Sequence, residues 1–169
     1  RLSIRATGCQ TVQSLAAPQN RPAAPDFRVE FAAARAYLQG SANPRGDRVT
    51  IHFHQNDLPD GLTLGPVVAI DTETMGLDPR RDRLCVVQLS SGDGHAHVVQ
   101  IARGQTSAPN LERLLADPAT LKLFHFGRFD IAALKNAFGV VTAPVWCTKI
   151  ASRLVRTFTD RHGLKMLCQ

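Results

Sequence analysis

The sequence lacks two features that would place it outside the cytoplasm. It contains no run of about 18 apolar residues, the length that a membrane-spanning helix needs. Its four cysteines form no CxxC pair and show no metal-type spacing, so neither a zinc module nor a disulfide framework is indicated. With 169 residues, 44% of them hydrophobic, the chain can bury a core without such staples. We therefore expect a cytoplasmic protein that does not enter a membrane.

Acidic residues are missing from the first 25 positions. Residues 1–48 hold seven Arg, no Lys and three acids, whereas the remaining 121 residues hold 13 basic and 11 acidic side chains. The net charge of +6 therefore lies mostly outside the part of the chain that carries the motifs described below. On its own, such a charge is weak evidence for nucleic-acid binding, because a basic excess of this kind can belong to a tail.

Residues 1–48 differ in kind from the rest, since they show no clear periodicity and contain three prolines between positions 18 and 25. We expect this extension to be largely disordered, with one helix possible over residues 27–38. Three origins are open for it: an organellar transit peptide, a basic arm, or sequence from upstream of the true start. We favour the last, because the chain begins with Arg1 and strand-like alternation starts abruptly at residue 49. Residues 49–169 are expected to form one domain.

From residue 49 onwards, short apolar segments alternate with glycine- and proline-containing turn signals. Early strands, two of them joined by a glycine-rich turn, precede alternating strands and helices. This order predicts an α/β fold with a mixed sheet flanked by helices. Asn110 is the predicted cap of the first helix, and Gly139 closes the second. The predicted strands cover residues 49–54, 67–71, 84–89, 96–99 and 121–126, and the predicted helices cover 110–116, 129–138 and 148–155, with another from near 163.

Two carboxylates, Asp71 and Glu73, stand at the end of the apolar strand predicted over residues 67–71. Because side chains alternate along a strand, both acids project to one face while Thr72 points to the other. Two adjacent negative charges repel unless one is protonated or a cation neutralises both, and Mg²⁺ takes oxygen ligands of this sort. A solvated strand end is the alternative. The carboxyl end of an apolar strand is where open α/β sheets build their sites, which favours a metal site.

Asp130 is the candidate for a further ligand, which a two-metal centre requires. It follows the predicted strand over 121–126 and falls in the first turn of a predicted helix. An acid at this position also interacts favourably with the helix dipole. The sequence alone is therefore equally consistent with a structural role for this residue.

Residues 71–79, DTETMGLDP, resemble the first motif of the DEDD 3′-5′ exonucleases, and residues 125–130, HFGRFD, resemble the second. Proofreading exonuclease domains of DNA polymerases share a similar first motif. Residues 83–89, 146–154 and 162–167 are similar to ribonuclease D. The second part of the chain is therefore identified as a ribonuclease D-like member of the DEDD superfamily.

The resemblance implies a ribonuclease H-like fold and a nuclease that removes nucleotides from a nucleic-acid 3′ end with two divalent cations, Mg²⁺ or Mn²⁺. The preferred substrate that it implies is a single-stranded RNA 3′ end, and DNA remains possible. By the same resemblance, the catalytic and metal-binding residues are Asp71, Glu73 and Asp130. The residues expected to bind substrate are Thr74, Met75, Leu77, His125 and Phe129, with Leu77 or Phe129 against a base. Phe129 also shares a helical stripe with three alanines, so a place in the core is equally consistent with the sequence.

The third motif of the family is not found in the sequence. The family has a fourth Asp, preceded by a Tyr or His that positions or activates the water. Here Asp160 is the single acid after Asp130, and the only Tyr, Tyr37, precedes the first motif. We therefore expect the exonuclease domain to be incomplete at its C-terminus. Two alternatives to an RNA exonuclease stay open: a metal- and nucleic-acid-binding protein with weak or no catalysis, and a DNA-directed, proofreading-type exonuclease.

Other polar side chains have structural explanations that compete with functional ones. Four histidines are expected at the surface, although the first two could face the site: His52, His54, His95 and His97. Three arginines after the first motif could contact phosphates, but a solvated turn is favoured: Arg80, Arg81 and Arg83. Trp146 could anchor the core or stack on a base.

Overall fold

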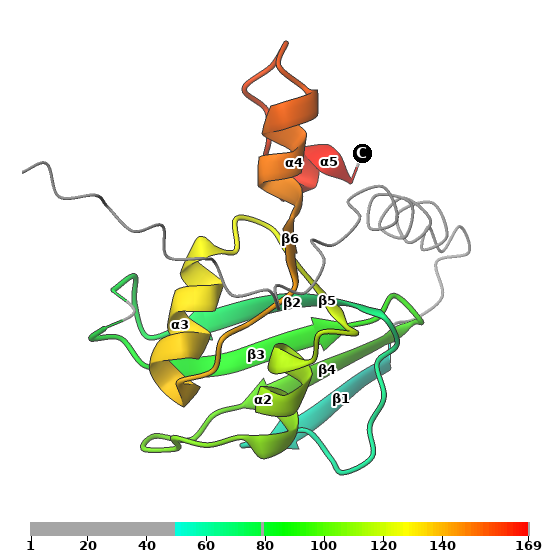
Figure 1. Ribbon diagram of the computed structural model, residues 1–169. Helices are drawn as coiled ribbons and strands as arrows, with labels where there is room; N and C mark the ends of the chain where they lie inside the picture. Colours follow the sequence, from blue (N-terminus) through cyan, green and yellow to red (C-terminus); the bar gives the residue numbers. More distant parts are fainter. Residues whose placement is uncertain (1–49, 79, 169) are drawn as a thin grey trace, which may run out of the picture.

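The computed structural model describes residues 50–78 and 80–168 and is shown in Figure 1. These residues form a six-stranded mixed sheet with the strand order β1-β4-β3-β2-β5-β6, and helices lie on both of its sides (Figure 1). The predicted α/β fold with a mixed, helix-flanked sheet is therefore confirmed. The disorder predicted for residues 1–48 and the helix considered over 27–38 lie outside the described residues. The division of the chain at residue 49 stays a prediction.

The strands follow one another as β1 (Thr50–Gln55), β2 (Val67–Thr74), β3 (Leu84–Ser90), β4 (His95–Gln100), β5 (Leu121–Phe124) and β6 (Val145–Cys147). The helices are α2 (Pro109–Ala116), α3 (Arg128–Phe138), α4 (Thr148–Val155) and α5 (Leu164–Leu167). β3 pairs antiparallel with both β2 and β4, whereas β1 with β4, β2 with β5 and β5 with β6 are parallel pairs. The antiparallel hairpin predicted for β3 and β4 is confirmed.

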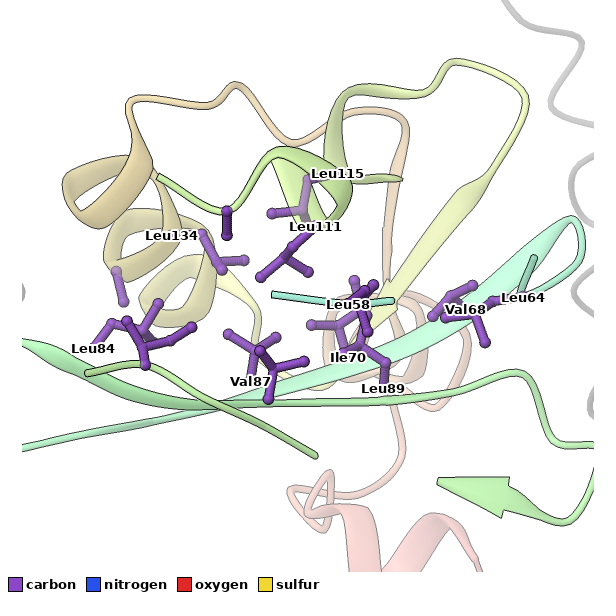
Figure 2. Close-up of a cluster of buried hydrophobic side chains, with 14 of the residues drawn as sticks. Leu58, Leu64, Val68, Ile70, Leu84, Val87, Leu89, Leu111, Leu115 and Leu134 are labelled. Carbon is purple, nitrogen blue, oxygen red and sulfur yellow. The ribbon is translucent and has the colours of Figure 1, made fainter. Parts of the chain in front are cut away.

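One face of the sheet is buried under α2 and α3. Ile70 of β2 and Val87 of β3 lie on this face, and Leu111 of α2 and Leu134 of α3 belong to the same buried cluster (Figure 2). Each of the four is at most 4% exposed. Complete burial of such a side chain stabilises the fold by about 1.5 to 3 kcal/mol. The cluster therefore fixes β2 and α3, which carry the predicted site residues, relative to each other.

Helix α2 begins differently from the prediction. It starts at Pro109 with Ala108 as the N-cap residue, so Asn110 is not its cap. Pro109 suits the first helical position because it has no N–H to satisfy. Asp57, from the loop after β1, accepts hydrogen bonds from the backbone N–H groups of Asn110 and Leu111, each at 2.9 Å. The cap comes from a residue distant in sequence, which a local pattern does not reveal.

Three strands near the predicted site also differ from their predictions. β2 continues to Thr74, because its pairing with β3 extends to Leu84. β5 ends at Phe124 rather than at residue 126, since Phe126 has a φ of 66°, which a strand does not contain. The short strand β6 is not predicted from the sequence, and it adds a parallel neighbour to β5.

The four histidines lie together on β1 and β4. His97 is 6% exposed, which corrects its predicted place at the surface. The reason is its register: His97 lies opposite Leu89 of β3, on the face that forms the core. Its Nδ1 is 3.0 Å from His54 Nε2, and a second pair joins His52 Nε2 to His95 Nδ1 at 2.9 Å.

Helices α4 and α5 stand on the opposite side of the sheet from α2 (Figure 1). Side chains of β2 that alternate away from the buried cluster face this second side, and Asp71 and Glu73 are among them. In the described part of the chain, every helix is too short or too polar to span a membrane. The face turned away from the packed core therefore carries Asp71 and Glu73.

Candidate functional site

Asp71 and Glu73 extend from β2 on the face turned away from the buried cluster. Burial alternates here, with Ile70 and Thr72 buried and the two carboxylates exposed. Strand pairing holds this register, since Asp71 lies opposite Gln88 of β3. As the alternation predicts, the two acids share one side and Thr72 takes the other.

Asp130 reaches this strand from the first turn of α3. β2 pairs with β5 only as far as Ala69, which lies opposite Leu123, so β5 no longer flanks Thr72. The Asp130 carboxylate takes that place. Its Oδ1 accepts a hydrogen bond from the backbone N–H of Thr72 at 3.1 Å and another from Thr72 Oγ1 at 2.7 Å. The approach is possible because β5 stops short and α3 begins soon after it.

Ionisation of Asp130 is resisted by its surroundings. Burial raises the pKa of this carboxyl above its ordinary value, and the nearby charge of Asp71 raises the pKa further. The hydrogen bonds from Thr72 act in the opposite direction. A carboxylate whose ionisation is opposed by a neighbouring negative charge is stabilised by a cation that binds both groups, and hard divalent ions take such oxygen ligands. The donor set of Asp71 and Asp130 therefore fits a divalent cation.

The three predicted metal ligands are not gathered into one compact group. Within residues 50–78 and 80–168, no three or more His, Cys, Asp or Glu side chains are arranged to hold a metal ion. Asp71 acts electrostatically on Asp130, whereas Glu73 stands exposed on β2. Like charges keep apart unless a cation draws them together. An exposed Glu side chain is free to change its rotamer and complete such a set.

His125 follows β5 and is held by Thr148 of α4. Its Nδ1 lies 2.9 Å from Thr148 Oγ1, and that hydroxyl donates to the carbonyl oxygen of Phe124 at 3.2 Å. The hydroxyl can donate either to that carbonyl or to Nδ1, so the contact holds the ring in place without fixing its tautomer; in the form with the hydrogen on Nδ1, Nε2 is the acceptor nitrogen. Burial lowers the pKa of His125, as does the charge of Lys149, while Asp71 opposes both. A neutral imidazole of this form can accept a hydrogen bond from a ligand hydroxyl.

A groove of about 380 Å³ brings Asp71 and His125 together. Strands β2, β3, β4 and β5 contribute to its lining, and Thr148 of α4 and Leu164 of α5 complete it. A mostly apolar groove with a few polar groups is the usual form of a small-ligand site. A larger hollow of about 810 Å³ lies around α2, but none of the predicted site residues line it. The groove that Asp71 and His125 line is therefore the better candidate for the binding site.

The substrate-binding residues predicted after Glu73 lie in a turn held by its own hydrogen bonds. Thr74 Oγ1 donates to the carbonyl oxygen of Gly76, and the N–H of Met75 donates to the carbonyl oxygen of Arg83 at 3.1 Å. The Met75 N–H is therefore used within the fold and is not free for a nucleotide. Its side chain is exposed, and Leu77 is 88% exposed, so both side chains are accessible to a ligand.

The arginines after this turn are engaged locally. Arg80 pairs with Asp78 at 3.4 Å, and Arg81 pairs with Asp82 at 2.8 Å. Arg83 donates through Nη1 to two backbone carbonyl oxygens. This arrangement corresponds to the solvated turn that the sequence favours.

The link between β5 and α3 contains a strained residue. Phe126 has a φ of 66°, in the left-handed region that costs a residue other than glycine about 1 to 3 kcal/mol. It is 48% exposed, and Lys149 Nζ lies 4.1 Å from its ring centroid. A cation–π contact at an exposed site contributes about 0.5 to 1 kcal/mol. That contact does not offset the strain, so stability alone does not explain Phe126.

Phe129 lies in the first turn of α3 and is half-buried. The buried residues of this helix are Asp130, Ala133 and Leu134. Of the helical stripe that the sequence assigns to the core, which is Phe129, Ala132, Ala133 and Ala137, only Ala133 is therefore buried. Phe129 stands at its edge, directly before Asp130.

Three supporting residues were not singled out by the sequence: Thr72, Cys147 and Thr148. Thr72 fixes Asp130 and Thr148 fixes His125, while Cys147 Sγ accepts a hydrogen bond from the N–H of Phe126 at 3.2 Å. One signal was available for Thr72, because a polar side chain on the buried face of a strand needs a hydrogen-bond partner. Cys147 and Thr148 depend on β6, whose three residues are too few to give a pattern.

Comparison with known proteins agrees with these motifs. A family model described as 3′-5′ exonuclease matches residues 49–169. Ribonuclease D of Acidiphilium cryptum (strain JF-5) is 39% identical over 110 residues, which are 65% of this chain and 28% of that protein. Ribonuclease D of Granulibacter bethesdensis (strain ATCC BAA-1260 / CGDNIH1) is 39% identical over 102 residues. The chain therefore spans about a quarter of the length of these curated relatives.

Solved structures of one protein match more of the chain. Brucella melitensis NrnC bound to pGG is 62% identical with a TM-score of 0.69, over 71% of this chain and 59% of that one. Brucella melitensis NrnC with bound Mg²⁺ is also 62% identical, with a TM-score of 0.68 over 70% and 60% of the two chains. The predicted resemblance to ribonuclease D and the ribonuclease H-like fold are confirmed by the matches taken together.

Proposed function

Because this chain belongs to the 3′-5′ exonuclease family, we propose that it is a metal-dependent nuclease that removes nucleotides from nucleic-acid 3′ ends. The reaction is hydrolysis of the terminal phosphodiester bond. The observation that carries the proposal is the placement of Asp130 against Thr72, next to Asp71 and the groove. It supports the roles that the sequence predicts for these carboxylates.

Two divalent cations, Mg²⁺ or Mn²⁺, would be held by Asp71, Glu73 and Asp130. When bound, such ions lower the pKa of an attacking water and stabilise the leaving 3′ oxygen. The protein's own part is to present the ligands. Thr72 holds one oxygen of Asp130 with two hydrogen bonds, which leaves the other oxygen of that carboxylate for a cation. The similarity to NrnC with bound Mg²⁺ supports this choice of ion.

His125 and the groove would position the substrate. Thr148 holds the imidazole in place, and the tautomer with its hydrogen on Nδ1 would accept a hydrogen bond from a ribose hydroxyl at Nε2. The exposed side chains of Met75, Leu77 and the half-buried Phe129 offer apolar contact to a terminal base. Such contacts accept every base, as successive removal of nucleotides requires.

RNA is the substrate that we propose first. The relatives named ribonuclease D and the complex of NrnC with pGG support nucleic acid as the ligand. The name ribonuclease D of these relatives favours RNA, whose 2′-hydroxyl is the group that distinguishes it from DNA. A DNA-directed, proofreading-type exonuclease is the alternative within the family.

Binding without turnover is a second candidate for the polypeptide as printed. It is favoured by one observation: in the part of the chain that the structure describes, no three or more His, Cys, Asp or Glu side chains are arranged to hold a metal ion. Without a positioned base, a hydrolase typically loses about two to four orders of magnitude in rate. Under this candidate the chain binds cation and nucleic acid but cleaves little.

The test is digestion of a 5′-labelled single-stranded RNA, and of DNA with the same sequence, in the presence of Mg²⁺ or Mn²⁺. Asp71→Ala is the control, because Asp71 is exposed and its removal leaves the buried cluster intact. The proposal predicts a ladder that shortens from the 3′ end, is faster with RNA, and is absent with the control. Equal cleavage by Asp71→Ala would contradict the proposal, and metal binding without any ladder would establish the second candidate.

A further inference from the structure

Phe126 is an aromatic side chain in a position that favours glycine. Its φ of 66° lies in the left-handed region, and about half of the residue is exposed. The next residue is glycine, but Gly127 has an ordinary negative φ and serves a different need, since a Cβ there would clash with Phe124. Gly127 therefore permits close packing against Phe124. Position 126, whose backbone conformation favours glycine, carries a phenylalanine instead.

The ring of Phe126 has no place in the buried core that would explain it. The buried cluster contains Phe124 but not Phe126. An asparagine or glycine at position 126 would adopt the same backbone conformation with less strain. Strained residues persist mainly where the surrounding structure holds them for a function. The exposed ring is therefore the feature that calls for a functional account.

Phe126 adjoins the groove through its neighbour in sequence and is not itself one of the lining residues. It directly follows His125, which lines the groove together with Asp71. Its N–H is tied to Cys147 Sγ at 3.2 Å, so the backbone that carries the ring is fixed. Lys149 lies 4.1 Å from the ring centroid and is close enough to His125 to lower the pKa of that imidazole. An aromatic face and a cation therefore stand together beside the groove.

We infer that Phe126 and Lys149 form a nucleotide-binding subsite beside the groove. A base of the oligonucleotide stacks on the face of the Phe126 ring that Lys149 leaves open, and the ammonium group of Lys149 contacts a phosphate of the same strand. Aromatic platforms beside cations are the usual means of binding single strands without regard to sequence. The inference rests on the proposed function, because it assigns a subsite to the same nucleic-acid ligand.

The test is binding of a short 5′-fluorescein-labelled oligoribonucleotide by anisotropy, with Ca²⁺ in place of Mg²⁺ to suppress turnover. In Phe126→Asn the ring is lost but the left-handed backbone is retained. The inference predicts a loss of affinity of about 5- to 100-fold, the range for one stacked base, with no fall in Tm. Phe158→Asn is the matched control, since Phe158 is 81% exposed beside Arg156 and neither of its neighbours in sequence, Thr157 and Thr159, lines the groove.

Lys149 is tested through the salt dependence of the same binding. Lys149→Gln is expected to reduce the slope of log affinity against log salt by about 1, as loss of one phosphate contact does. Lys135→Gln, a change of an exposed lysine in the last turn of α3, is expected to leave the slope unchanged.

The outcomes separate the subsite from the proposed function. Wild-type affinity in Phe126→Asn, with binding and cleavage intact in the wild type, overturns the subsite alone. A fall in Tm for Phe126→Asn without loss of affinity also overturns it, because the ring is then structural. If the wild-type chain neither binds nor cleaves the oligonucleotide, the proposed function and the subsite both fail.

Discussion

Asp130 is proposed to bind a cation as a carboxylate, yet its surroundings disfavour that ionised form. Its burial and its proximity to Asp71 both raise its pKa, so the folded chain resists the ionised form. A raised pKa means that the folded state binds more protons than the unfolded state above the ordinary value of 3.8. Stability is therefore lost as the pH rises from that value through the raised pKa, and the penalty is present in full above the raised pKa. A bound cation would remove the penalty.

Replacing Asp130 with asparagine is expected to stabilise the protein and to abolish activity. The amide keeps an oxygen that can accept the hydrogen bonds from Thr72 but carries no charge. We expect the free energy of unfolding at pH 7 to rise by about 0.5 to 2 kcal/mol, as is common when a functional site is relaxed. Urea denaturation over a series of pH values checks this, with a gain that shrinks as the pH falls through the raised pKa of Asp130. A loss of stability at pH 7 would contradict the account of this residue.

Gly127 is expected to tolerate no side chain. A Cβ there would overlap Phe124, a buried residue of β5, and such overpacking typically costs about 1 to 3 kcal/mol. Gly127→Ala should lower the midpoint of urea denaturation accordingly. Gly163→Ala is the matched control, since no atom lies within 4 Å of a Cβ at that position and its φ is negative. Equal midpoints for the two variants would show that the link can shift to make room.

Sequence reasoning is reliable for residues whose placement is local. Alternation along one strand was enough to put Asp71 and Glu73 on one side, because the period of a strand is a property of the backbone. The bond between Thr72 and Asp130 joins residues 58 positions apart. A pattern within one element cannot reveal a contact over such a separation in sequence. The sequence therefore predicted Asp71, Glu73 and Asp130, but not the Thr72 hydroxyl that fixes Asp130.

The helices and strands likewise have features that a local pattern predicts and features that depend on residues distant in sequence. The hairpin of β3 and β4 was predictable because its turn is short and rich in glycine. The parallel pairs β1 with β4 and β5 with β6 were not, since their partners are separated by other elements and their register depends on the whole sheet. The cap of α2 by Asp57 belongs to the same class. The predicted elements and the one predicted pairing, β3 with β4, were thus largely correct, whereas the other pairings were not predicted.

Strands β1 and β4 carry a cluster of paired histidines that should make this edge of the sheet sensitive to pH. Burial lowers the pKa of His54 and His97, and neighbouring histidines lower it further, while Asp93 opposes the shift at His97. A lowered pKa means that the unfolded state takes up protons first as the pH falls below 6.5. This contribution to stability is therefore present above pH 6.5 and is lost as the pH falls towards the lowered values.

Hydrogen exchange of the β1 amides is expected to report this loss. After correction for the intrinsic rate, protection of residues 50–55 should fall between pH 7 and pH 5 more than protection of β2. His54→Gln removes one titrating ring, so we expect a shallower fall in that variant. Protection that is independent of pH in the wild type would show that the cluster does not couple protonation to the attachment of β1.

At the scale of the whole molecule, the sheet separates the buried cluster from Asp71, Glu73 and the groove, while Asp130 reaches the site from the core side, where it bonds to Thr72. The buried cluster under α2 and α3 occupies one face, while the exposed acids and the groove lie on the other. Changes to exposed residues of the second face should therefore alter binding without unfolding the chain. The net charge of +6 contributes little to this argument, because residues 1–48 hold most of it.

The most direct test of the central claim is calorimetric titration of Mn²⁺ into the wild-type chain, Asp71→Asn and Asp130→Asn. The account predicts binding by the wild type and its loss in both variants, with all three folded by circular dichroism. Binding of Mn²⁺ to Asp71→Asn with wild-type affinity would contradict the claim that these carboxylates hold the cation.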